Sequence, residues 1–367
     1  MSFITSIGTA NPTHRFTQQT IANFMVVASN LQDDEARKLR ALYRATGIET
    51  RHSVLSDYGR KSGFEFFPDN GLIESFPSTS QRMELFKTHA KALSVCSINK
   101  CLEKITSFKK TEITHLIVVS CTGLYAPGLD IDLVKVLELN STISRTCINF
   151  MGCYAAFNAL KLADSFCANE KNAKVLMVCT ELCSLHFQKE NTEDNLLANA
   201  LFADGSAALL IEGNPRKGIN LKPISFHCDI ESEGEQDMAW SVGDWGFAMK
   251  LSTYVPEVIR SGIKQLAKSL LTKINKDLSQ VDYYAIHPGG KKILEVIEQE
   301  LRLNKEQNRF AYEVLKNFGN MSSPTVLFVL NEIADTLTDR DQNKNILSFA
   351  FGPGLTLESM LLQIEWH

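Results

Sequence analysis

Phe150-Met151-Gly152-Cys153-Tyr154-Ala155-Ala156-Phe157 joins a short apolar run to a long stretch rich in Ala, Leu and Phe. Gly152 permits a tight turn, and the apolar side chains around the circumference of residues 154–168 predict a buried helix. Cys153 is therefore expected at or near a helix N-terminus, where unpaired N–H groups and the helix dipole favour a thiolate. A buried core cysteine, as expected of Cys96 and Cys167, fits the local pattern equally well.

Short apolar runs and longer helical stretches alternate on both sides of this segment. In the first half they predict strands at His115–Ser120, 174–179 and 206–212, and helices at 82–105 and 154–168. In the second half they predict strands at 281–286, 346–351 and 355–364, and helices at 255–273, Lys291–Leu301 and 324–337. Such alternation is typical of an α/β fold in which a mostly parallel sheet has helices on both faces.

A polar stretch at 212–218, which contains Gly213, Pro215 and Gly218, separates the two halves of the chain. Clusters of glycine, proline and polar residues between periodic segments are typical of loops. We therefore predict two similar α/β halves, residues 1–213 and 214–367, fused into one compact layered body.

The composition is that of an ordinary soluble globular protein, with 44% hydrophobic and 22% charged residues. The net charge of −4 gives no sign of a general affinity for nucleic acid. No apolar run approaches the roughly 18 residues that a membrane span needs, and the N-terminus has no signal-like pattern. We expect a cytoplasmic enzyme with no nucleic-acid or membrane partner.

The nine cysteines follow no spacing typical of a disulfide framework. Most lie in apolar segments, which fits buried thiols in a reducing compartment. Cys179 and Cys183 are separated by three residues, but no matching second pair exists, so we predict no metal site.

Two further segments carry residues that could act with Cys153. His287 ends an apolar run in Ile286-His287-Pro288-Gly289-Gly290, and the carboxyl end of such a strand is where α/β proteins place ligands. Asn320 lies in Gly319-Asn320-Met321-Ser322-Ser323, just before Ser323-Pro324, a sound start for the following apolar helix. Taken singly, His287 could be satisfied within a turn and Asn320 could be a capping residue.

Cys153, His287 and Asn320 each fall at a turn that leads into a helix, so they can converge on one edge of a sheet. A thiolate, an imidazole and a neutral amide form a usable set for acyl-thioester chemistry. The cysteine can accept an acyl group, while the histidine and asparagine can donate hydrogen bonds to a thioester oxygen that becomes an enolate.

In these segments the chain resembles the type III polyketide synthases, the chalcone and stilbene synthase-like family of the thiolase superfamily. The resemblance runs from end to end of the chain, and the order and separation of its motifs are specific. The matching segments are Ile7-Gly8-Thr9-Ala10-Asn11-Pro12, Ser120-Cys121-Thr122-Gly123 with Ala126-Pro127-Gly128, Phe150-Met151-Gly152-Cys153, Ala200-Leu201-Phe202-Ala203-Asp204-Gly205, Ile286-His287-Pro288-Gly289-Gly290, Gly319-Asn320-Met321-Ser322-Ser323 and Phe351-Gly352-Pro353-Gly354.

The resemblance implies a thiolase-like fold and an iterative condensing enzyme. An acyl-CoA starter would be loaded onto Cys153, whose thiolate is paired with His287. Malonyl-CoA would be decarboxylated, with His287 and Asn320 stabilising the enolate that attacks the bound acyl group, and the chain would then cyclise. The family acts as a homodimer on free CoA thioesters and needs no metal or other cofactor.

The resemblance also assigns the walls of the substrate pocket. Phe202 matches an aromatic gate, Gly352-Pro353-Gly354 matches a loop in the wall, and small Cys121 leaves space toward the dimer partner. At several positions this chain differs from the plant enzymes. It has Met249 where they have a second aromatic gate, Trp240 and Ala350 where they have glycine, His186 where they have threonine, and Ala126 where they have methionine. The CoA phosphates should meet a basic helix near Lys38, Arg40 and Arg44.

These departures predict a narrow channel that suits an aliphatic starter better than a bulky phenylpropanoid. Other classes of protein remain open at this point. They are a ketosynthase III-like enzyme that condenses once with an extender from a carrier protein, a cysteine acyl-hydrolase, and a non-catalytic scaffold. The sequence around Asn320 favours condensing enzymes over hydrolases. A thiolase proper needs a second late cysteine, and none follows Cys228.

Overall fold

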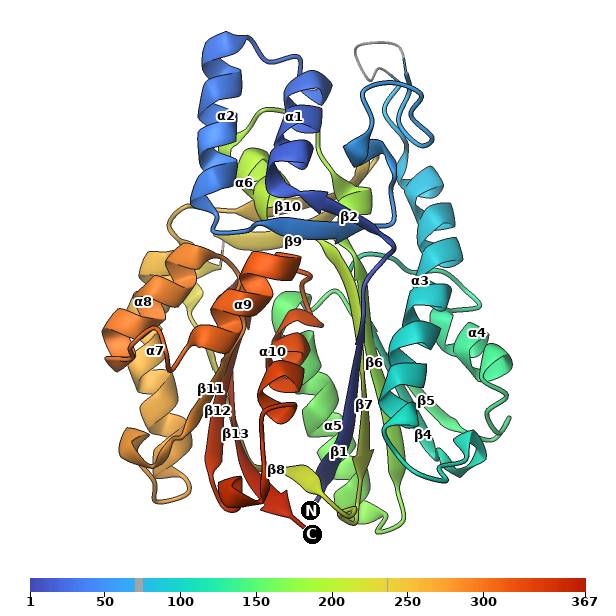
Figure 1. The fold of residues 1–367 in the computed structure, drawn as a ribbon, viewed down its shortest axis with the longest axis vertical. Coiled ribbons are helices and arrows are strands. Elements are labelled where there is room, and N and C mark those ends of the chain that lie inside the picture. Colours follow the sequence, from blue (N-terminus) through green and yellow to red (C-terminus); the bar gives the residue numbers. More distant parts are fainter. Residues whose placement is uncertain (70–74, 236) are drawn as a thin grey trace.

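The computed structural model describes residues 1–69, 75–235 and 237–367. Its largest sheet has nine strands in the order β11-β12-β13-β8-β1-β7-β6-β4-β5 (Figure 1). The first half of the chain supplies β1 (Phe3–Ala10), β4 (His115–Ser120), β5 (Ser144–Asn149), β6 (Lys174–Leu182) and β7 (Asp204–Glu212). The second half supplies β8 (Ile219–Ile230), β11 (Tyr283–Ile286), β12 (Asn345–Gly352) and β13 (Thr356–Trp366).

The two halves meet in the middle of this sheet, where β1 and β8 share the register pair Ile4↔Leu221. Every strand on one side of that junction comes from the first half, and every strand on the other side comes from the second. This is the arrangement expected of two α/β halves fused into one body.

The prediction of a mostly parallel sheet is wrong, because the sheet is mixed. The pairs β4–β5, β4–β6 and β11–β12 are parallel, whereas β1–β7, β1–β8, β6–β7, β8–β13 and β12–β13 are antiparallel. An apolar run shows that a strand is buried on both faces but carries no information about its direction. The strands β1, β5 and β8 were also not predicted; β5 reads as polar because it forms an exposed edge.

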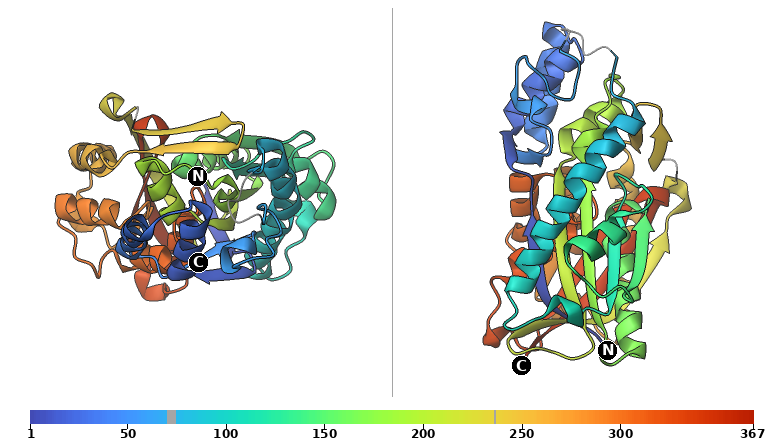
Figure 2. Two further views of the ribbon diagram at one scale, coloured as in Figure 1. Left: turned by 90° about the horizontal axis from the view of Figure 1, so that it is seen from above. Right: turned by 90° about the vertical axis from the view of Figure 1, so that its right-hand side faces the viewer.

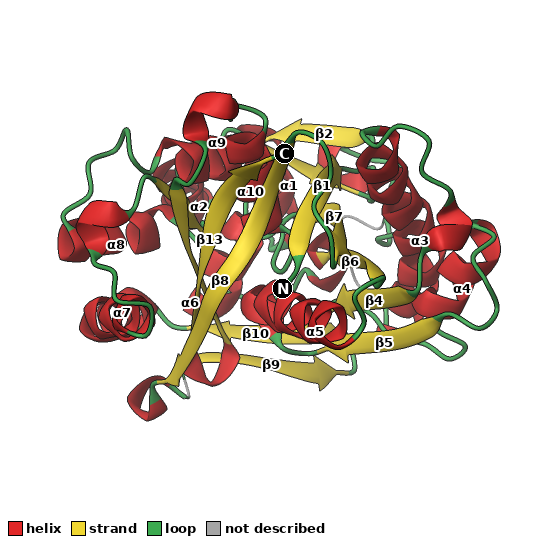
Figure 3. Ribbon diagram, turned by 90° about the horizontal axis from the view of Figure 1, so that it is seen from below, coloured by secondary structure: helices red, strands yellow, loops and turns green. Residues whose placement is uncertain are grey.

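Helices form layers outside and between the two halves of the sheet (Figure 3). On the first half, α3 (Thr79–Glu103) and α4 (Leu129–Val136) cover one face; on the second, α7 (Val255–Thr272) and α8 (Lys291–Leu301) do so. Between the halves lie α5 (Ala155–Asn169) and α10 (Thr325–Ala334), and α9 (Arg309–Phe318) packs on α10. Apolar side chains surround the central helices because both must face a sheet on more than one side.

Shorter elements gather at the end of the sheet that is opposite to both termini (Figures 1 and 2). They are α1 (Gln18–Ala28), α2 (Asp33–Ala45), α6 (Glu193–Leu201), the pair β2 (His14–Thr17) and β3 (Thr50–Ser53), and the hairpin β9 (Met238–Gly243) and β10 (Gly246–Leu251). The carboxyl ends of β4, β5 and β11 point toward this region, so the turns that follow them can build a site there.

All nine cysteines are free thiols. Cys101, Cys121, Cys153, Cys167, Cys179 and Cys183 are buried, but Cys96, Cys147 and Cys228 are exposed. The expectation that Cys96 is a core residue is therefore wrong, because it occupies the outward face of α3.

Candidate active site

Cys153, His287 and Asn320 line one buried cavity at the carboxyl ends of the strands. Cys153 lies in a single 3-10 turn, Gly152–Tyr154, between β5 and α5. His287 directly follows β11, and Asn320 lies between α9 and α10. The structure thus brings together the three residues that the sequence singled out from segments far apart in the chain.

Gly152 fixes where Cys153 sits. Its φ of 75° lies in the left-handed region, and a Cβ atom there would come within 2.3 Å of Pro353 Cδ. Only glycine fits between the cysteine turn and the 352–354 loop without displacing one of them. The loop thereby holds Cys153 against the cavity from one side, with Pro353 in its lining.

The Asn320 amide is oriented by its neighbours. Its Oδ1 accepts a hydrogen bond from the backbone N–H of Ser322 at 2.8 Å and lies 3.9 Å from Cys153 Sγ. Its Nδ2 donates to the carbonyl of Gly289 at 3.2 Å, two residues beyond His287. One Nδ2 hydrogen is committed to this bond, and the second is left to donate to another acceptor.

His287 is 1% exposed, and its backbone N–H donates to the carbonyl of Phe349 at 2.8 Å. Neither ring nitrogen has a hydrogen-bond partner among the residues that the structure describes. Burial lowers the pKa of the imidazole to about 3, so the ring is neutral near pH 7. A neutral imidazole offers one N–H donor and one acceptor, and buried polar atoms of this kind call for a ligand or another partner.

The Cys153 thiol is protonated at neutral pH. Burial raises its pKa to about 12, and the carboxylate of Glu181 acts in the same direction, while hydrogen bonding with Ser322 and Asn320 acts against it. The expected lowering by the helix N-terminus is thus outweighed by removal of the sulfur from water. A thiolate at this position requires a proton acceptor, and the free nitrogen of His287 lies in the same cavity.

The other walls of the cavity include most of the residues assigned by resemblance. Cys121, Phe202, Trp240, Met249 and Pro353 line it directly. Gly352 packs against the ring of Tyr154, and Gly354, with a φ of 88°, turns the chain into β13. The lining residues that the sequence did not assign to the pocket are Thr122, Gly152, Cys183, Met238, Leu251, Gly289, Ile293, Ser322 and Phe351.

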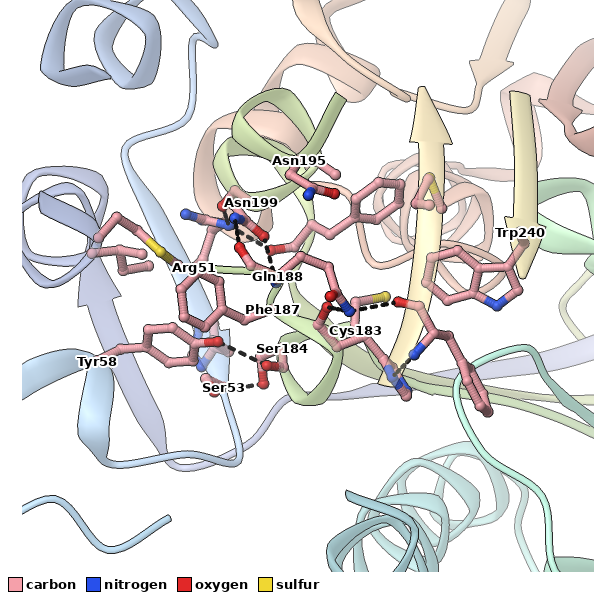
Figure 4. Close-up of a pocket in the computed structure, with 18 residues that line it drawn as sticks. Arg51, Ser53, Tyr58, Cys183, Ser184, Phe187, Gln188, Asn195, Asn199 and Trp240 are labelled. Atoms are coloured by element: carbon pink, nitrogen blue, oxygen red, sulfur yellow. Dashed lines mark hydrogen bonds between the residues drawn. The ribbon is translucent and has the colours of Figure 1, made fainter. Parts of the chain in front are cut away.

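A second cavity adjoins the first, and Cys183, Phe202, Trp240 and Met249 line both. Trp240 lies at one end of it and Tyr58 at the other (Figure 4). We call the side chains shared by the two cavities the partition. Trp240 is fixed in the partition because its Nε1 donates to the carbonyl of Cys121 at 2.8 Å.

His186 lines the second cavity and not the first. Its Nε2 is 2.7 Å from the carbonyl of Thr122, and its Nδ1 accepts the backbone N–H of Phe247 at 2.9 Å. The ring also stacks on Phe247, with 4.3 Å between centroids. With both nitrogens used by the backbone, His186 is a wall residue, and substrate can meet only its ring.

Glu181 was missed by sequence reasoning. This fully buried carboxylate accepts hydrogen bonds from the backbone N–H of Cys121 and the hydroxyl of Thr122, both at 2.8 Å, and from the hydroxyl of Ser323 at 2.6 Å. It thereby ties the end of β4 to the turn before α10. The signal in the sequence was a lone acidic residue at the end of an apolar strand.

A groove of about 240 Å³ adjoins the cavity of Cys153, His287 and Asn320. Leu251, Gly289 and Ile293 line both spaces, while Lys291 and Lys292 lie at the mouth of the groove. The α2 residues that line the groove are Leu42 and Ala45, and not the predicted Lys38, Arg40 and Arg44. Arg40 instead donates to Asn23 of α1 at 3.3 Å.

No helix in the described part of the chain is both long and apolar enough to cross a membrane. Within residues 1–69, 75–235 and 237–367, no group of three or more His, Cys, Asp or Glu side chains is placed to hold a metal ion.

The layered α/β body and its central cysteine turn define a protein of the thiolase-like class. Within that class, the chain belongs to the chalcone and stilbene synthase family. The model of the N-terminal domain of chalcone and stilbene synthases matches residues 1–215, and that of the C-terminal domain matches residues 227–365. The predicted fold class and family are therefore confirmed, and the chain is a type III polyketide synthase, a transferase of CoA thioesters.

Individual relatives agree with this assignment. The chain is 32% identical over 370 residues to the α-pyrone synthesis polyketide synthase-like Pks18 of Mycobacterium tuberculosis, covering 99% of this chain and 91% of that protein. It is 31% identical to the probable polyketide synthase 1 of Dictyostelium discoideum over 99% of its length, but spans only 11% of that protein. The crystal structure of PKS-I from the brown alga Ectocarpus siliculosus is similar, with a TM-score of 0.92, 29% identity and coverage of 99% and 98% of the two chains.

Proposed function

We propose that this chain condenses malonyl-CoA repeatedly, with loss of CO₂, onto an acyl group held on Cys153. The observation that carries the proposal is the meeting of three groups in one buried cavity. They are Cys153, Asn320 and the His287 imidazole, which has no hydrogen-bond partner among the described residues. Each of these groups has a separate task in the reaction.

Loading begins when a CoA thioester reaches the thiol. The Cys153 proton moves to the free nitrogen of His287 as sulfur attacks the thioester carbonyl carbon. The carbon–sulfur bond to CoA then breaks, and the CoA thiolate leaves with the proton from His287. Because burial keeps the thiol protonated, this transfer makes the nucleophile only when the electrophile is present.

Extension begins when free CoA has left the site and malonyl-CoA binds in its place. The bond from the α-carbon to the carboxylate breaks and CO₂ leaves, which places negative charge on the thioester oxygen. The neutral His287 ring and the free Nδ2 hydrogen of Asn320 can donate to that oxygen. The enolate carbon then attacks the acyl carbonyl on Cys153, and the cysteine sulfur leaves, ready to accept the extended chain.

We propose that CoA enters by the groove of Lys291 and Lys292. Its phosphates would meet these two lysines, which stand at the mouth where the pantetheine arm must pass. Lys38 stays in the proposed site because it shares a helix face with Leu42 and Ala45, which line the groove. Arg40 and Arg44 are dropped from it, since Arg40 turns toward α1.

For the starter we propose a fatty acyl-CoA, with an α-pyrone or an alkylresorcinol as the product. The walls around Cys153 are mainly apolar, and the flexible Met249 can move to admit a chain of varied length. Trp240 narrows the space toward the second cavity. Support also comes from the relative Pks18, whose name assigns α-pyrone synthesis to it.

We propose a homodimer joined at the β5 edge of the sheet. β5 is the last strand in the sheet order, and all of its residues are exposed or half-buried. Leu124, after β4, and Val136, in α4, are 50% and 49% exposed. An open edge beside apolar side chains is a template for pairing with another chain, and light scattering with size-exclusion chromatography should give twice the monomer mass.

A panel of acyl-CoA starters with malonyl-CoA, followed by mass spectrometry of the products, tests the proposed reaction. We expect fatty acyl starters to be extended faster than aromatic ones. A clear preference for 4-coumaroyl-CoA would contradict the fatty acyl assignment, and a single extension with every starter would contradict iterative condensation.

A further inference from the structure

Arg51 of β3 is a buried cation whose partners are uncharged. Its side chain is 4% exposed. Its Nε donates to Gln18 Oε1 at 2.8 Å, and its Nη1 donates to the carbonyls of Asn199 at 2.8 Å and Phe202 at 2.6 Å. Figure 4 shows Arg51 beside Asn199. Buried arginines are normally paired with carboxylates, so these neutral partners need an explanation.

The explanation lies in the end of helix α6. Asn199, Ala200 and Phe202 belong to its last turn and C-cap, where carbonyls have no partner within the helix and the dipole is negative. Arg51 binds the first and last of these carbonyls, and Gln18 donates to the carbonyl of Ala200 at 2.7 Å. The helix end therefore compensates part of the positive charge, and the nearby carboxyl of Asp204 also favours the charged guanidinium.

The carbonyl of the remaining residue, Leu201, accepts the backbone N–H of Asn320 at 3.0 Å. The carbonyl of Asn320 in turn accepts the N–H of Ala203 at 2.8 Å, which makes a β-bridge between Phe202 and Asn320. The peptide that carries the gate and the peptide that carries the catalytic amide are thus held side by side.

Arg51 touches both sides of this bridge. Its guanidinium holds the Phe202 carbonyl, and its alkyl stem packs under Gly319, where a Cβ atom would come within 2.9 Å of Arg51 Cγ and Cδ. A planar guanidinium can reach several carbonyls at once, whereas an ammonium acts as a single point charge.

We propose that Arg51 is the positioning residue for this site, because it fixes the Phe202–Asn320 bridge and so the amide that donates to the enolate. The inference rests on the proposed function, in which Asn320 is that donor. A shift of about 1 Å in a catalytic group can cost about 10²-fold in rate, so loss of this support should be visible in decarboxylation.

Arg51→Met, which keeps the stem and removes the donors, and the milder Arg51→Lys test this role. Decarboxylation of malonyl-CoA is measured as CO₂ release, acyl loading of Cys153 by intact-protein mass spectrometry, and the folded fraction by thermal unfolding. We expect Arg51→Met to lower decarboxylation about 10²-fold while loading per folded molecule stays near the wild-type rate. Arg51→Lys should give a decarboxylation rate between those of the wild type and Arg51→Met.

Arg82→Met is the matched control. Arg82 is 0% exposed and likewise donates to backbone carbonyls, those of Pro77 at 3.0 Å, Phe187 at 3.2 Å and Leu185. Those carbonyls lie outside the Phe202–Asn320 bridge, so the variant should lose stability but keep the wild-type ratio of decarboxylation to loading.

Equal loss of decarboxylation and loading in the Arg51 variants, or no loss of either, would overturn the positioning role. If Arg51→Met does not fold, the same ratio measured for Arg51→Lys decides the matter. Failure of the proposed function gives a different result, since the wild type itself would then release no CO₂ from malonyl-CoA.

Discussion

His186 lines the second cavity and His287 lines the first, and the two residues differ in the hydrogen bonding of their ring nitrogens. Both are buried, and burial lowers the pKa of each to about 3. Both nitrogens of His186 are bonded to the backbone, whereas those of His287 have no partner among the described residues. Burial and pKa are therefore the same for both residues and do not distinguish them. What distinguishes His287 from His186 is that its ring nitrogens are left without hydrogen-bond partners among the described residues.

The largest difference should come from removing the donors on the catalytic side. Asn320→Ala and His287→Ala are each expected to lower malonyl-CoA decarboxylation by about 10²–10³-fold, the usual cost of a donor to a developing oxyanion. Asn320→Ala should still accept an acyl group on Cys153, as read by intact-protein mass spectrometry. Decarboxylation at the wild-type rate would reduce Asn320 to a turn residue.

His186→Gln provides the other arm of the comparison. It leaves one or more backbone groups unpaired, which should lower the free energy of unfolding by about 1–3 kcal/mol. Decarboxylation per folded molecule should stay near the wild-type rate. A loss as large as that of His287→Ala would show that the two histidines are not distinguished by their hydrogen bonds.

The two histidines should contribute equally to the change of the unfolding free energy with pH. The folded pKa of each, about 3, lies below the reference value of 6.5, so the unfolded state takes up the proton first as the pH falls. Each ring then costs up to about 1.4 kcal/mol of stability per pH unit below pH 6.5. We expect His287→Gln and His186→Gln to flatten the unfolding free energy equally between pH 6.5 and 5, as measured by urea titrations. An unchanged slope in either variant would mean that its ring has the same pKa in the folded and unfolded states.

Opening the partition should have the smallest effect. Trp240→Gly removes a side chain that both cavities share, and we expect the preference for fatty over aromatic starters to fall about tenfold, as for other changes of pocket volume. Trp245→Gly is the control, because this tryptophan lies in the same hairpin but is 53% exposed. Equal starter ratios in wild type and Trp240→Gly would leave Trp240 a structural residue.

The sequence was sufficient for the two-half architecture and for selecting three residues that the structure places in one cavity. Cys153, His287 and Asn320 each stand at a turn before a helix, in motifs that match the family. Strand direction could not be predicted, because burial on both faces looks the same in parallel and antiparallel strands. The edge strand β5 was missed because its exposed residues resemble a loop.

The burial of Arg51 and the hydrogen-bond partners of Glu181 could not be predicted from the sequence. Arg51 lies in a short polar strand, Thr50–Ser53, whose pattern suggests the surface. Its burial arises only when α6 and the Gly319 turn pack over it. The partners of Glu181 come from β4 and α10, which no local pattern brings together.

The central claim assigns two tasks to different groups, with Cys153 holding the acyl chain and His287 and Asn320 stabilising the enolate. Cys153→Ala separates them most directly when CO₂ release from malonyl-CoA and polyketide formation are followed in the same reaction. We predict that this variant makes no polyketide and forms no acyl-enzyme but still releases CO₂. Full product formation by Cys153→Ala would contradict the account.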